Sequence, residues 1–143
     1  MEIILHRKNT ISELKEANDL YGIEIDLRSQ NNKLVIHHDP FSKNPEDFDL
    51  WLKNYRHGTL IINIKEEGLE DKIIYCLNKN GINNYFFLDQ SFPFLVTKNK
   101  LVKRKTALRF SEYESVETII KSASYANWIW IDCFNFYPEI DSS

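Results

Sequence analysis

Glycine and proline are scarce in this sequence of 143 residues, with four of each, and their scarcity excludes collagen-like and low-complexity chains. A large charge excess is also lacking, because 18 Lys and Arg residues oppose 21 Asp and Glu residues and give a net charge of −3. This charge does not indicate binding to nucleic acid or to an anionic membrane. The two cysteines, Cys76 and Cys133, form no CxxC motif, and a reduced pair is the simplest interpretation. No apolar run approaches the ~18 residues of a membrane span, and the N-terminal run is too short for a signal peptide. We therefore expect a cytoplasmic protein with a single domain over residues 1–143.

Short apolar runs alternate with amphipathic segments along the chain. The runs have the length and the Ile, Phe, Tyr and Trp content of β-strands, and they lie at Glu2–Leu5, Gly22–Leu27, Leu60–Ile64, Tyr85–Leu88, Thr106–Phe110 and Trp128–Ile131. Helical spacing is found between them at Thr10–Leu20, Leu69–Asn80 and Ser115–Ala123. Lys33–His37 follows a polar turn and predicts an added strand or an extended arm. The alternation predicts an α/β fold, a TIM-barrel-like (β/α) parallel barrel shortened to about six βα units.

Charged and polar side chains collect where the expected strands end. In a barrel the carboxyl ends of the strands converge on one mouth, which is the usual site of catalysis. The alternative is that strands end in polar residues because loops are solvated, and it carries most weight for Asp89 and Asp132 taken singly. The expected mouth residues are His6, Arg7, Glu24, Asp26, Asn63, Lys65, Asp89, Arg109, Glu112 and Asp132. This mixture of acids, bases and fixed cations suits phosphate chemistry better than carbonyl or glycosidic chemistry.

Two carboxylates, Glu24 and Asp26, are two residues apart on one expected strand. Residues at i and i+2 of a strand point to the same face, about 6–7 Å apart. Two inward carboxylates repel each other unless a cation or a base neutralises them, and a divalent metal is the natural partner for hard oxygen ligands. The alternative is a pair of solvated acids on an exposed strand face, and the spacing alone does not decide between the two.

Two histidines, His37 and His38, end the Lys33–His37 segment. Adjacent residues of a strand point to opposite faces, so only one of the two can enter a site. A histidine near neutral pKa can act as a general acid or base. Taken alone, however, the pair is most simply interpreted as two surface histidines.

Together these segments resemble the glycerophosphodiester phosphodiesterases, a family of phospholipase C-like enzymes with TIM-barrel folds. The resemblance is carried by His6-Arg7 with Asn9-Thr10, by Glu24-Ile25-Asp26, and by the segment 34–40 with its sequence LVIHHDP. Further matches to a compact bacterial branch lie at 60–68, 84–93, 108–114 and 128–134, so the resemblance covers nearly the whole chain in order.

The resemblance implies a role for each matching position. His6 and His38 match the acid/base pair of the family, and His37 lies outside the motif. The metal ligands are matched by Glu24, Asp26 and Asn63, and the residues that neutralise the substrate phosphate by Arg7 and Lys65. The implied cofactor is one divalent cation, Mg²⁺ or Ca²⁺. The implied reaction is hydrolysis of a small-molecule glycerophosphodiester to an alcohol and glycerol 3-phosphate.

Two positions depart from the family pattern, and two other functions compete with hydrolysis. Lys8 stands where the family has glycine, and Asn63 replaces a carboxylate, which should weaken metal binding. One competing hypothesis is a degenerate family member that binds a phosphorylated ligand or a partner chain without turnover. The other is a metal-independent lyase using His6, His38 and Arg7, but it would leave two inward carboxylates uncompensated.

A barrel of about six units leaves strand edges exposed, and we expect a second copy of the chain to cover them. The edges would be Glu2–Leu5 and Trp128–Ile131, and the apolar area beside the second edge is concentrated in Trp128, Trp130, Phe134, Phe136 and Tyr137. The sequence thus predicts a homodimer. The alternative is that the tail 133–143 folds over the opening.

Overall fold

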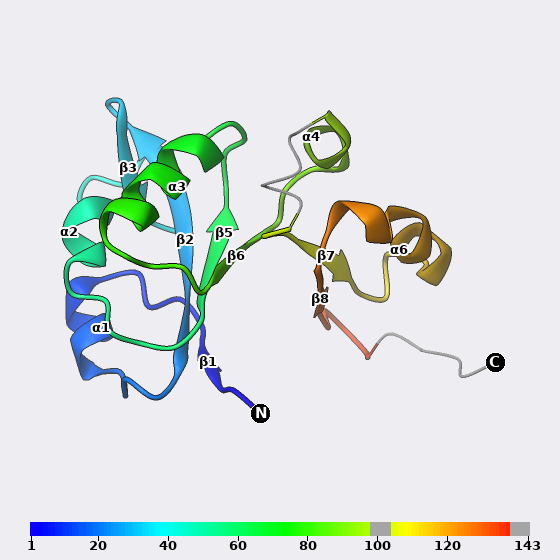
Figure 1. Ribbon diagram of the computed structural model, residues 1–143, viewed down its shortest axis with the longest axis horizontal. Coiled ribbons are helices and arrows are strands. Elements are labelled where there is room, and N and C mark those ends of the chain that lie inside the picture. The colour runs from blue at the N-terminus through cyan, green and yellow to red at the C-terminus, as the bar shows by residue number, and fades with distance from the viewer. Residues whose placement is uncertain (98–103, 138–143) are drawn as a thin grey trace. The chain divides into compact units, whose positions relative to one another are not determined.

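The computed structural model describes residues 1–97 and 104–137, and its chain divides into two compact units, Met1–Phe86 and Phe87–Ser143 (Figure 1). The first unit contains β1 (Ile4–Leu5), α1 (Ile11–Glu16), β2 (Gly22–Gln30), β3 (Lys33–Ile36), β4 (Glu46–Asp47), α2 (Phe48–Leu52), β5 (Leu60–Ile64) and α3 (Glu70–Lys79). β6 (Tyr85–Leu88) contains the boundary between the units. The second unit continues with α4 (Phe92–Thr97), β7 (Ala107–Phe110), α6 (Val116–Ser122), the 3₁₀ turn η1 (Ala123–Tyr125) and β8 (Trp128–Ile131). The single domain expected over residues 1–143 stays a prediction.

The strands form a mixed sheet of six strands and a separate parallel pair. The order in the larger sheet is β4-β3-β2-β5-β6, and β1 also pairs with β2, whereas β7 pairs with β8. The nine-residue β2 has partners on both sides, since β1 pairs in parallel with its first two residues, β3 pairs antiparallel with its last four, and β5 pairs in parallel with residues 23–27 (Figure 1).

The prediction of a TIM-barrel-like parallel barrel is therefore wrong. A barrel needs a continuous ring in which every strand is paired on both sides. Here β1 pairs with β2 over only two residues, the antiparallel strands β3 and β4 extend the sheet beyond β2, and among the described residues β7 and β8 pair in a sheet of their own. Within residues 1–97 and 104–137 the strands form two open sheets and no closed barrel.

Most of the strands and helices expected from the sequence are present. Thr10 caps α1 and forms a reciprocal capping box with Glu13, and Ser115 caps α6 through its side chain. Gly81 follows α3 with φ +71°, a left-handed conformation that glycine adopts without steric cost. Three short elements, β4, α2 and α4, with two, five and six residues, were not predicted from the sequence.

The core of the first unit fixes the direction in which the side chains of β2 point. Ile23, Ile25 and Leu27 are fully buried on one face of the strand, so the alternating residues Glu24 and Asp26 point to the other face. In the part of the chain that the structure describes, no helix has both the length and the apolar character needed to cross a membrane.

Candidate functional site

Two fully buried carboxylates, Glu24 and Asp26, form the centre of the candidate site in the first unit. Asp26 of β2 lies directly opposite Asn63 of β5 in the parallel pairing of these strands. Lys65 is the first residue after β5, so it lies just past the carboxyl end of the paired stretch of β2 and β5. Placement by strand register explains why residues about 40 positions apart in the sequence meet here.

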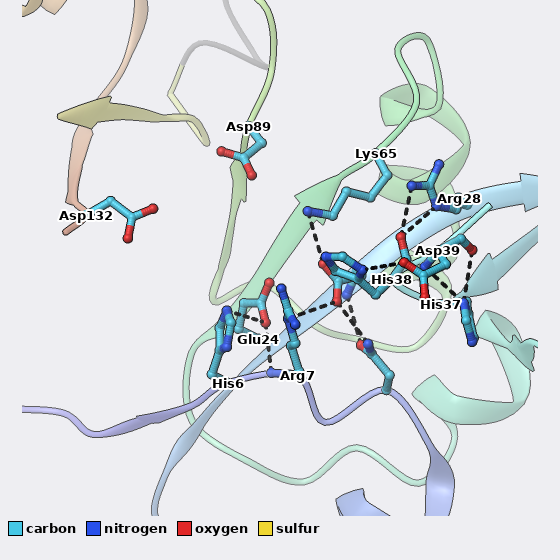
Figure 2. Close-up of polar contacts among 12 residues, drawn as sticks. His6, Arg7, Glu24, Arg28, His37, His38, Asp39, Lys65, Asp89 and Asp132 are labelled. Carbon is cyan, nitrogen blue, oxygen red and sulfur yellow. Dashed lines mark hydrogen bonds and ion pairs between the residues drawn. The ribbon is translucent and has the colours of Figure 1, made fainter. Parts of the chain in front are cut away.

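The carboxylate of Glu24 meets the chain just after β1. Its Oε2 atom accepts a 2.8 Å hydrogen bond from the backbone N–H of Arg7 and lies 3.5 Å from Nε2 of His6 (Figure 2). Arg7 has φ 54°, a left-handed conformation that a non-glycine residue adopts rarely, and this conformation accompanies the approach of its N–H to Glu24. Burial raises the pKa of Glu24 and the nearby charge of Asp26 raises it further, while the Arg7 hydrogen bond and His6 oppose the shift.

Asp26 has a denser set of partners. Its Oδ2 atom accepts a 2.9 Å hydrogen bond from Nδ2 of Asn9, and Oδ1 of Asn9 accepts the backbone N–H of Asp26 at 3.0 Å. Nζ of Lys65 lies 3.2 Å from Oδ1 of Asp26, and Nε of Arg7 lies 3.9 Å from Oδ2. Asn9 is thus a site residue that the sequence analysis quoted in its motif but gave no role.

Three buried oxygens of this site accept no hydrogen bond. They are Oε1 of Glu24, Oδ1 of Asp26 and Oδ1 of Asn63. Buried polar atoms of folded proteins nearly always have a partner, so these three oxygens are the atoms of the site that remain able to accept one. For Asp26 the ion pair with Lys65 compensates part of the charge, although that contact lacks hydrogen-bond geometry.

The chemistry of these oxygens fits a hard divalent cation such as Mg²⁺ or Ca²⁺, which takes carboxylate and amide oxygens as ligands. The third oxygen comes from the amide of Asn63. Across the described ranges, 1–97 and 104–137, no group of three or more His, Cys, Asp or Glu side chains is arranged to hold a metal. Of the three oxygens, two belong to carboxylates and one to an amide.

The two histidines after β3 point in different directions (Figure 2). His37 donates its backbone N–H to the carbonyl of Asp26 at 3.0 Å, and this bond ties the segment to the site. The Nδ1 atom of His38 lies 2.8 Å from Oδ1 of Asp39, so Nε2 is the ring nitrogen that this contact leaves available. The hydrogen bond with His38 lowers the pKa of Asp39. Arg28 donates from Nε and Nη2 to the carbonyl of His38 and fixes the backbone there.

Three of the four expected mouth residues of the second unit, Asp89, Arg109 and Asp132, form a cluster within that unit. Arg109 donates hydrogen bonds to Asp89 and to Asp132, and its guanidinium carbon lies 5.5 Å from the centre of the Phe134 ring. Burial works against the charged form of Arg109, but Asp89 and Asp132 outweigh it and raise its pKa. Glu112 is not in the cluster, because its carboxylate accepts the backbone N–H groups of Phe134 and Asn135.

The single mouth expected for both sets of residues depended on a closed barrel. Because the described strands form no closed barrel, their carboxyl ends are not expected to converge on one mouth. There is then no reason to expect that the cluster around Arg109 shares a site with Glu24 and Asp26. The candidate site is accordingly the group in the first unit, made of His6, Arg7, Asn9, Glu24, Asp26, Asn63, Lys65 and His38.

Comparison of the chain with protein-family models, with curated proteins and with solved structures finds no match. The resemblance to glycerophosphodiester phosphodiesterases therefore rests on the sequence motifs alone and stays a prediction.

Proposed function

We propose that this protein is a metal-dependent phosphodiesterase that hydrolyses a small glycerophosphodiester to an alcohol and a phosphomonoester. The observation that carries the proposal is the group of three buried oxygens without hydrogen-bond donors, on Glu24, Asp26 and Asn63. A divalent cation bound there would polarise a phosphoryl oxygen and offset charge that develops in the transition state.

The cationic side chains around the carboxylates support phosphate as the substrate group. Arg7 and Lys65 both approach Asp26, at 3.9 Å and 3.2 Å, and their side chains are 52% and 19% exposed. A half-exposed guanidinium can turn to an incoming phosphate without leaving a buried charge unpaired, and its planar fork fits two phosphate oxygens. Lys65 adds a point charge from the other side of Asp26.

The two histidines supply proton transfer in this proposal. One imidazole takes a proton from the attacking water while the water oxygen bonds to phosphorus, and the other gives a proton to the alcohol oxygen as its bond to phosphorus breaks. In sum, one diester and one water are converted to one monoester and one alcohol, and the two histidines together neither gain nor lose a proton. His6, 3.5 Å from Glu24, and His38, held by Asp39, are the two groups.

A ligand-binding protein without turnover is the second candidate, and one contact favours it. Nζ of Lys65 already lies 3.2 Å from Asp26, so part of the negative charge is balanced within the chain. If that balance suffices, the site binds a phosphorylated ligand and needs no metal.

The deciding experiment is a metal-supplemented assay on glycerophosphocholine and on bis(4-nitrophenyl) phosphate, with Glu24→Gln as the matched variant. We expect activity that disappears on chelation, returns with Mg²⁺ or Ca²⁺, and is lost in Glu24→Gln. Activity that resists chelation would indicate the metal-independent lyase, and ligand binding without turnover would indicate the second candidate. We also propose that the protein is cytoplasmic and that it forms a homodimer.

A further inference from the structure

A pocket of about 490 Å³ lies in the first unit beside the candidate site. Its walls come from the end of β2, from the segment after β3 and from the residues that follow β5. A volume of this size is typical of sites for small organic ligands. The metal, phosphate and acid/base roles proposed above leave this space without an assignment.

The pocket adjoins the candidate site at two residues, Lys65 of the site and Asp39 beside His38. Lys65 lines it and also reaches Asp26, with 3.2 Å between Nζ and Oδ1. Asp39 lines it and holds His38 through the 2.8 Å contact at Nδ1. A phosphodiester bound at Lys65 can therefore extend one of its two organic groups into this space.

Hydrogen bonds hold the walls of the pocket in place before any ligand arrives. Glu66 accepts hydrogen bonds from the backbone N–H of Ser29 at 2.9 Å and from its hydroxyl at 2.7 Å, and these bonds join the segment after β5 to β2. The side chain of Gln30 donates to the carbonyl of Ser42 at 3.3 Å and joins β2 to the segment after β3. Walls fixed in this way lose little freedom when a ligand binds.

Phe41 is the unusual residue of the pocket. Its side chain is 95% exposed although it is a large aromatic group, and its backbone φ is +60°. A bulky residue in the left-handed region is strained, and such strain concentrates where a ligand is held. Pro40 precedes it and limits the conformations of the segment. An aromatic ring presented to solvent at a pocket provides a flat surface on which another ring can stack.

The size and lining of the pocket indicate what kind of group it receives. A volume of about 490 Å³ lies in the range of pockets that take organic ligands larger than glycerol. Stacking on Phe41 requires a ring, while the carboxylate of Glu66 and the amide of Gln30 suit hydroxyl groups.

We propose that this pocket receives a hydroxyl-bearing ring, a cyclitol or the sugar of a nucleoside, as the organic group of the phosphodiester, and that Phe41 selects it by stacking. This inference rests on the proposed function for the identity of the diester, but the pocket itself can be tested apart from turnover.

The experiment measures both binding and turnover in wild type, Phe41→Asn and Phe41→Tyr, in the presence of Mg²⁺. Binding of inositol 1-phosphate, uridine 5′-monophosphate and ethanolamine phosphate is followed by calorimetry, and turnover is compared on glycerophosphoinositol and glycerophosphoethanolamine. Asn tolerates a left-handed backbone, so Phe41→Asn removes the ring without new strain, and Tyr keeps the ring. Thermal unfolding checks that both variants fold.

We expect a ring-bearing ligand to bind at least about tenfold more tightly than ethanolamine phosphate, with KM following the same order. Phe41→Asn should abolish that preference, and Phe41→Tyr should keep it. The uridine and inositol arms distinguish a nucleoside from a cyclitol. Equal binding of all three monoesters, no binding of any of them, or a preference that survives in Phe41→Asn would overturn the inference.

The same measurements separate this inference from the proposed function. If no diester is turned over but the ring preference in binding is present and lost in Phe41→Asn, the pocket assignment stands and the hydrolase proposal fails. If both diesters are hydrolysed with equal KM, the hydrolase proposal stands and the pocket assignment fails.

Discussion

Asp26 of β2 and Asn63 of β5 lie directly opposite each other in a parallel pairing, and each has a buried side-chain oxygen that accepts no hydrogen bond. Oε1 of Glu24 is a third buried oxygen of this kind. Among the described residues, these three are the buried side-chain oxygens that accept no hydrogen bond. Negative charge at such a place costs stability unless a cation compensates it. Metal binding is therefore the first property to measure.

Removal of the carboxylates should abolish binding of a divalent cation. Titration of the wild type with Mg²⁺, Ca²⁺ and Mn²⁺ in a calorimeter should give saturable heats, and the Glu24→Gln, Asp26→Asn double variant should give none. The isosteric changes keep the shape of the site and remove only its charge. Equal heats for the two proteins would contradict metal binding at this site.

Loss of His38 should reduce kcat much more than loss of His37. His38→Ala should cost on the order of 10²–10⁴ in rate, the usual contribution of a positioned acid or base. His37→Ala should cost little, because its ring points away from that of His38 and its link to Asp26 runs through the backbone N–H (Figure 2). If steady-state kinetics gives the reverse order, the assignment of the acid/base residue is wrong.

Asn9 should be a stability determinant of the site. Its side chain makes two hydrogen bonds with Asp26, at 2.9 and 3.0 Å, and truncation leaves a buried carboxylate short of a donor. Asn9→Ala should lower the free energy of unfolding in urea by about 1–3 kcal/mol. Asn54→Ala is the matched control, because Asn54 makes an exposed hydrogen bond to Leu50, and its effect should be the smaller of the two.

The two cysteines should differ in reactivity. Cys76 is half-buried in α3, where burial raises the pKa of its thiol and lowers the thiolate fraction at neutral pH, whereas Cys133 is exposed. Iodoacetamide at pH 7.5 should label Cys133 at least about tenfold faster, as peptide mapping by mass spectrometry would show. Faster labelling of Cys76 would mean that α3 opens in solution.

The homodimer stays a prediction, and its most favourable surface is β8. Trp128, Ile129 and Ile131 are each about half exposed, and within the described residues β8 pairs with β7 alone. An unblocked apolar edge of this kind pairs readily with another chain. Light scattering at tens of micromolar should show a dimer that Ile129→Lys dissociates.

A stable monomer in both proteins would favour the alternative, in which the tail 133–143 covers the opening. Residues 138–143 of that tail lie outside the described residues.

The sequence alone predicted the local elements of this protein, because they depend on short-range patterns. Alternation of apolar and charged residues over 22–27 was enough to predict β2 and to place Glu24 and Asp26 on one face, and the expected helical segments Thr10–Leu20 and Ser115–Ala123 start one residue before α1 and α6. The polar turn at 29–32 likewise predicted an added strand or an extended arm at Lys33–His37, and the structure forms the strand β3 at Lys33–Ile36. The hairpin makes β3 antiparallel to β2, so the sheet is mixed and differs from the all-parallel sheet that the alternation of strands and helices predicted.

Only the tertiary structure decided which of the polar strand ends meet. Strand register brought Asn63 opposite Asp26, and the left-handed turn at Arg7 brought a backbone N–H onto Glu24. The role of Asn9 and the exposed, strained Phe41 also became visible only there. These features depend on contacts between segments remote in sequence, and no local periodicity encodes such contacts. The sequence therefore determined which chemical groups are present and on which face of each strand they lie, whereas strand pairing determined which of them form a site.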